Sequence, residues 1–79
     1  MPRLPPRSTR EIEELLLHHG YRLTRSEGGH NQWRRDADGR RVTVPRGRRS
    51  GEISQGTLAS ILRQAGISRE EALRFWRIA

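Results

Sequence analysis

The sequence contains no cysteine, no lysine and few aromatic residues. Without cysteine, neither a disulfide framework nor a cysteine-based zinc site can form. No apolar run approaches the length that spans a membrane, and the start Met1-Pro2-Arg3 lacks the apolar region of a signal peptide. These absences exclude disulfide-stapled and membrane-spanning classes, and they predict a cytoplasmic protein.

What is present is a short and very basic chain. Its 79 residues suffice for one small domain, and only 16 of them are Leu, Ile, Val or Phe, so the core must be thin. All sixteen basic residues are arginine, and the formal net charge is +7. A small domain with this charge commonly binds a polyanion such as nucleic acid, or an acidic protein partner.

Proline and serine mark where the folded part is expected to begin. Pro2, Pro5 and Pro6 predict that residues 1–7 form a flexible arm, followed by a single domain over residues 8–79.

Ser8 and Glu11 have the spacing of a capping box, which opens a helix. An apolar stripe at helical spacing follows, and Gly20 suits the position that ends the helix. The stripe consists of Ile12, Leu15, Leu16 and His19. His18 and His19 lie near the helix C-terminus, where their charge complements the helix dipole; this explanation is favoured over metal binding, because no third ligand is evident.

The middle of the chain predicts three strands, over residues 21–26, 30–35 and 40–45. Gly28-Gly29 and the segment 36–39 provide the turns between them.

Two more helices are expected after the strands. Ser54 caps one that ends at Gly66, and Ser68 opens a short last helix. The order α-β-β-β-α-α predicts an α+β fold with a three-stranded antiparallel sheet and helices on one face.

His30 is the candidate catalytic residue. Side chains alternate along a strand, so Trp33 would face the core with Val42 and Val44, while His30 and Gln32 face the opposite side. A histidine is the side chain best suited to move a proton near neutral pH. The opposite face of the second and third strands is predicted to carry His30, Gln32, Arg34, Arg41 and Thr43.

Histidine beside arginines favours cleavage of RNA, because RNA supplies its own nucleophile, the 2′-hydroxyl. The protein then needs only to shift a proton and offset phosphate charge, so neither a metal nor a cofactor is expected. The basic loop from Arg46 to Gly51 has two open interpretations, phosphate contact or a solvated linker. The residues predicted to bind RNA are Gly28, Gly29, Gln32, Arg34, Arg40, Arg41, Arg46, Arg48 and Arg49.

Five stretches of the chain form a characteristic set. They are Ser8-x-x-Glu11-Ile12-x-x-Leu15-Leu16, His19-Gly20-Tyr21, Gly28-x-His30-x-x-Trp33, Asp38-Gly39-Arg40-Arg41-Val42-Thr43-Val44-Pro45 and Gly56-Thr57-Leu58-x-Ser60-Ile61-Leu62-Arg63-Gln64-Ala65-Gly66. Together they resemble the HicA family of toxin–antitoxin mRNA interferases over about residues 8–75.

This resemblance implies a double-stranded-RNA-binding-domain-like fold and cleavage of mRNA without the ribosome. It also implies silencing by a HicB antitoxin that packs over the toxin. The family's catalytic histidine matches His30. Gly29 stands where the family commonly has serine, and Gln55 stands where it commonly has proline.

Two non-catalytic alternatives remain. The Gly66-Ile67-Ser68 turn within residues 62–72 is similar to a helix-turn-helix, although Glu70 and Glu71 would oppose phosphate at the start of its recognition helix. A double-stranded-RNA binder that reads shape alone is the other alternative, although the predicted sheet is short for that role.

Overall fold

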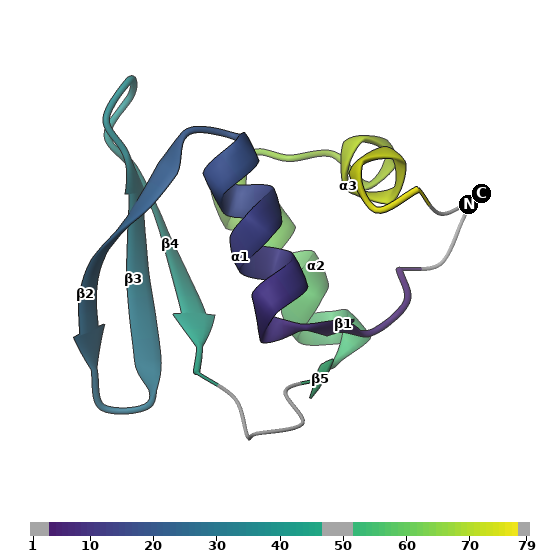
Figure 1. The fold of residues 1–79 in the computed structure, drawn as a ribbon, viewed down its shortest axis with the longest axis horizontal. Helices are drawn as coiled ribbons and strands as arrows, with labels where there is room; N and C mark the ends of the chain where they lie inside the picture. Colours follow the sequence, from purple (N-terminus) through teal and green to yellow (C-terminus); the bar gives the residue numbers. More distant parts are fainter. Residues whose placement is uncertain (1–3, 47–51, 78–79) are drawn as a thin grey trace.

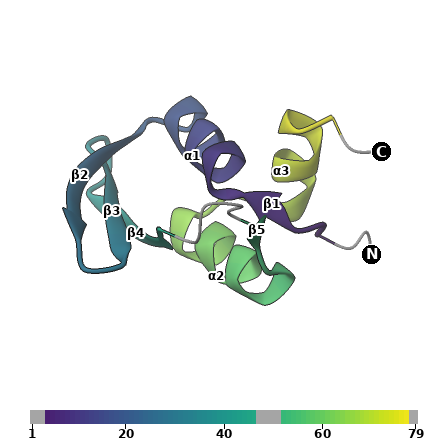
Figure 2. The ribbon, with the colours of Figure 1, turned by 60° about the horizontal axis from the view of Figure 1, so that its bottom comes forward.

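A computed structural model describes residues 4–46 and 52–77. Its central element is a three-stranded antiparallel sheet of order β2-β3-β4, with α1 and α2 on one side of it (Figures 1 and 2). The α+β prediction is confirmed. The elements are β1 (Arg7–Ser8), α1 (Thr9–His18), β2 (Tyr21–Glu27), β3 (His30–Arg35), β4 (Arg40–Pro45), β5 (Glu52–Ile53), α2 (Gln55–Ala65) and α3 (Arg69–Phe75).

The helices begin and end where local chemistry satisfies their terminal backbone groups. Ser8 and Ser68 each form a complete capping box, and Ser54 caps α2 by accepting a hydrogen bond from the amide of Thr57. Gly66 ends α2 in the left-handed conformation, with φ +69°. The predicted caps are therefore confirmed.

The core lies between the sheet and the helices. Tyr21 joins the two layers, because its hydroxyl donates a hydrogen bond of 2.8 Å to the backbone oxygen of Ala65. Among the described residues one buried apolar cluster forms. Its members are Leu4, Ile12, Leu15, Leu16, Tyr21, Trp33, Val42, Val44, Ile53, Leu58, Ile61, Leu62, Ala65, Ile67, Ala72 and Leu73.

The expected flexible arm does not hold for residues 4–7. Leu4 is only 1% exposed and lines the same small pocket as Leu62 and Ile67. Strand β1 pairs antiparallel with β5, and Arg7 lies opposite Ile53. Pro5 and Pro6 favour an extended path after Leu4, and such a path still allows the Leu4 side chain to reach the core. Residues 1–3 lie outside the described residues.

Helix α3 lies beyond α1 and α2, on the far side from the sheet (Figures 1 and 2). Trp76, directly after it, donates from Nε1 to the backbone oxygen of Glu11 at 3.2 Å, and the guanidinium of Arg7 stacks 5.6 Å from the Trp76 ring. The last helix and the N-terminal segment therefore brace each other.

None of the helices in the described part of the chain is long and apolar enough to cross a membrane.

Candidate active site

His30 is the first residue of β3 and is exposed to solvent. It follows a two-residue turn in which Gly28 adopts φ +61°, a conformation that favours glycine. Gly29 is not in that region, and a Cβ built on it would meet nothing within 4 Å. The turn therefore requires glycine at position 28 only, and position 29 has room for a side chain.

The strand register assigns each side chain to a face of the sheet. Trp33 pairs with Val42 and both are buried, whereas Gln32 pairs with Thr43 and Arg34 pairs with Arg41. The Gln32–Thr43 and Arg34–Arg41 pairs therefore lie with His30 on the face that no helix covers, as predicted. We call this side the open face; its described members include Arg22, Arg25, Glu27, His30, Gln32, Arg34, Arg41 and Thr43.

A hollow of about 540 Å³ lies on the open face, one row of side chains away from His30. Four arginines and a single acidic residue line it, so the hollow is strongly basic. The lining residues are Arg22, Thr24, Arg25, Glu27, Gln32, Trp33, Arg34 and Arg41.

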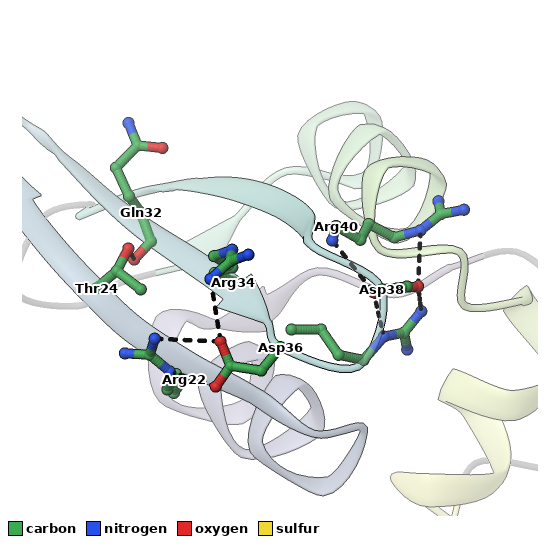
Figure 3. Close-up of polar contacts among 8 residues, drawn as sticks. Arg22, Thr24, Gln32, Arg34, Asp36, Asp38 and Arg40 are labelled. Carbon is green, nitrogen blue, oxygen red and sulfur yellow. Dashed lines mark hydrogen bonds and ion pairs between the residues drawn. The ribbon is translucent and has the colours of Figure 1, made fainter.

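Gln32 lines this hollow and contacts both neighbouring strands. The Thr43 hydroxyl lies 3.0 Å from Gln32 Oε1. The Thr24 hydroxyl donates 3.1 Å to the Gln32 backbone oxygen, and Figure 3 shows these two residues. Within the described residues, the Gln32 amide nitrogen makes no hydrogen bond. It is therefore a donor that an incoming ligand can use.

Asp36 fixes two of the arginines at the far end of the hollow. Its carboxylate accepts hydrogen bonds from Arg22 at 2.8 and 3.1 Å and from Arg34 at 3.2 Å (Figure 3). The bond from Arg22 is the main cause that lowers the pKa of the Asp36 carboxyl. All three groups are exposed, so this network orients the guanidinium groups more than it stabilises the fold.

Arg41 and Arg46 lie at different distances from His30. Arg41 is in the row of Arg34, four residues or about 13 Å along the sheet from the row of His30. Arg41 is exposed and makes no ion pair within the part of the chain that the structure describes. The backbone amide of Arg46 donates 2.7 Å to the oxygen of Gly29, which holds Arg46 beside the turn that precedes His30.

Arg40 lies elsewhere, although the sequence grouped it with the RNA-binding residues. Its guanidinium donates 3.2 Å to the backbone oxygen of Gln64 at the end of α2. Arg40 pairs with Arg35, which is five residues from His30 in β3, so the two positions are about 16 Å apart along the strand. The structure therefore does not bring Arg40 together with His30, and Arg48 and Arg49 lie outside the described residues.

Next to Arg40, Asp38 closes the turn at the end away from His30. The hydrogen bond from Arg35, followed by one from the Arg40 amide, lowers the pKa of Asp38 from 3.8 to about 2. These contacts stabilise a turn that lies far from the candidate catalytic group.

Residues 9–67 match the family model of the HicA toxin of bacterial toxin–antitoxin systems. The match covers well over half of the 79 residues. The chain belongs to the HicA toxin family. No curated protein matches it significantly.

Membership of the HicA family implies an antitoxin partner, because these toxins act in two-component systems. The matched segment includes all of β2, β3 and β4, and therefore the hollow and His30. It ends before α3, so Arg7 and Trp76, which contact each other, both lie outside the segment matched to the HicA model.

Sequence reasoning missed the contribution of β2 to this HicA surface. Glu27 is the direct cross-strand neighbour of His30, and its carboxylate pairs with Arg25 at 2.6 Å. A two-residue turn always places its flanking residues opposite each other, so the Glu-Gly-Gly-His spacing was the available signal. Alternation alone misplaces Arg25, because the register shifts between Leu23 and Arg25.

The other histidines serve packing. His18 lies 4.9 Å, ring to ring, from Phe75 of the segment after the matched region, and burial lowers the pKa of the His19 imidazole despite the opposing charge of Glu71. Among the described residues no three His, Asp or Glu side chains come together as a metal site.

The helix-turn-helix alternative gains no support. Helix α3 has only seven residues and carries Glu70 and Glu71 in its first turn. Its buried residues Ala72 and Leu73 hold it against the core.

Proposed function

We propose that this HicA toxin is an endoribonuclease that cleaves mRNA in the cytoplasm, without the ribosome and without a metal ion. The observation that carries the proposal is the position of His30, exposed at the edge of a basic hollow on the face that no helix covers. A proton-transfer group beside several cations is what phosphodiester cleavage requires.

The reaction begins with attack of the RNA 2′-oxygen on the adjacent phosphorus. His30 accepts the hydroxyl proton and then delivers a proton to the departing 5′-oxygen. One P–O bond forms and one breaks, giving a 2′,3′-cyclic phosphate and a 5′-hydroxyl. Arg46, whose backbone is bound beside the turn that precedes His30, is proposed to offset the charge that grows on the phosphate oxygens.

The same surface suits a HicB-type antitoxin. The chain has a net charge of +7, and four arginines line the hollow on the open face. Acidic side chains of a partner would be steered to this face and would block RNA from His30 by covering it.

Cleavage of a purified mRNA by the purified chain is the test of this proposal. We expect equal cleavage rates in excess EDTA and in magnesium, because the described residues offer no ligand cluster for a metal. Loss of cleavage in EDTA, restored by a divalent ion, would contradict the metal-free reaction. Binding of RNA without any cleavage would favour the non-catalytic alternative.

The same cleavage assay tests the proposed role of the antitoxin. The cognate antitoxin should stop cleavage, and crosslinks should join its acidic residues to the open face. A neutralising antitoxin that crosslinks only to α1 or α3, with His30 still accessible, would contradict direct occlusion.

A further inference from the structure

We infer that the hollow on the open face is a binding subsite for single-stranded RNA. In this arrangement the RNA strand runs along β3, and the nucleotide next to the cleaved phosphate occupies the hollow. The inference rests on the proposed function and adds the location, the direction along the sheet and the strandedness of the substrate.

Spacing along β3 is the first argument. His30, Gln32 and Arg34 occupy successive positions on the open face, and side chains two residues apart on a strand are separated by about 6.6 Å. That separation is close to the distance between successive phosphates of an extended nucleic-acid strand. An RNA with one phosphate at His30 would therefore place its next phosphate near Gln32 and the following one near Arg34.

Charge is the second argument. Arg41 lies across from Arg34 and makes no ion pair among the described residues, so its full charge is available to a phosphate. Arg25 and the two arginines bound by Asp36 are already oriented by carboxylates. We therefore expect Arg41 to supply the largest share of phosphate affinity in the hollow.

The polar side chains that line the hollow are suited to contact a base or a ribose. The Gln32 amide nitrogen is a donor without a partner among the described residues, and Thr24 and Thr43 fix the position of Gln32. An amide side chain contacts the edges of unstacked bases, which are accessible in single-stranded RNA. Gln32 should therefore influence which base is accepted, with little effect on overall charge-driven affinity.

The width of the sheet favours a single strand. The outer strands β2 and β4 are about 10 Å apart, because neighbouring strands are spaced by about 4.8 Å. Double-stranded-RNA-binding domains span about 16 base pairs across two minor grooves. One hollow of about 540 Å³ has room for a nucleotide but not for that footprint.

The experiment measures binding of an uncleavable 2′-O-methyl oligonucleotide at several salt concentrations. It compares Arg41→Ala with Arg69→Ala, which removes the same charge from the exposed start of α3, away from the sheet. For single strands the slope of log K against log salt is about −0.7 per phosphate contact. We expect Arg41→Ala to reduce its magnitude by about 0.7 and Arg69→Ala to leave it unchanged. Gln32→Ala should keep the slope and alter the preference among homopolymers.

Three results would overturn the subsite. One is the same slope for Arg41→Ala and Arg69→Ala; another is tighter binding of a duplex than of a single strand. The third is an Arg41→Ala variant that loses the antitoxin but keeps the RNA slope, which would assign the hollow to the protein partner. In each case, continued RNA cleavage by the unaltered chain would leave the proposed function standing, whereas no cleavage would refute that function separately.

Discussion

Replacing His30 by alanine should lower the rate of RNA cleavage by about 10²–10⁴, the usual contribution of a positioned proton-transfer group. His30 is the sole histidine of the open face, and the other two histidines lie at the end of α1. The loss should appear in the cleavage rate at saturating RNA, because the arginines proposed to bind phosphate remain in place.

The variant should also keep its fold. The His30 side chain is exposed and is not part of the apolar core, so its removal leaves no cavity. His18→Ala provides the matched control, because it removes another exposed histidine on the helix side of the molecule. Circular dichroism should give the same spectrum for all three proteins. Equal cleavage by folded His30→Ala and His18→Ala would show that another group transfers the proton.

Replacing Leu4 by alanine should destabilise the domain by about 2–5 kcal/mol, the range for truncating a buried leucine. Leu4 is 1% exposed in a thin core, so the lost contacts form a large share of the total stability. Leu17→Ala is the matched control. Its side chain is 58% exposed, and its truncation should change stability by less than about 0.5 kcal/mol.

Urea denaturation of the two variants decides the point. A shift of the midpoint for Leu4→Ala, with no change for Leu17→Ala, would establish the N-terminal segment as part of the folded domain. Equal midpoints would mean that Leu4 is not held in the core in solution, as a flexible arm would behave.

Local chemistry explains why so much of the fold followed from the sequence. The caps at Ser8, Ser54 and Ser68 depend on contacts three residues away, so their signals are complete within a short stretch. The two faces of β3 follow from strict alternation around Trp33. His30, Gln32 and Arg34 were therefore placed correctly on the open face.

The parts that were missed depend on distant partners. Strand β1 is two residues long and pairs with β5, which lies far along the chain, so neither segment carries a local signal. Arg40 was grouped with the RNA-binding residues by charge alone. In the fold its guanidinium reaches the backbone oxygen of Gln64 in α2, a choice that only the packed structure determines.

The site predicted from the sequence lacked some of its residues for a related reason. Arg25 and the hollow beside Gln32 depend on the bulge in β2, and a bulge changes which side chains share a face without leaving a clear pattern in the sequence. Glu27 was missed for a different reason, because its place opposite His30 follows from the two-residue turn between the strands and not from its own charge.

The central claim is that His30 assists a reaction in which RNA supplies the nucleophile. The most direct measurement maps one cleavage position and then replaces only the nucleotide on its 5′ side by the 2′-deoxy form. We predict that cleavage stops at that position, continues at unaltered positions, and yields 2′,3′-cyclic phosphate ends there. Continued cleavage at the deoxy position, or 3′-hydroxyl products, would require an external nucleophile and would contradict this account.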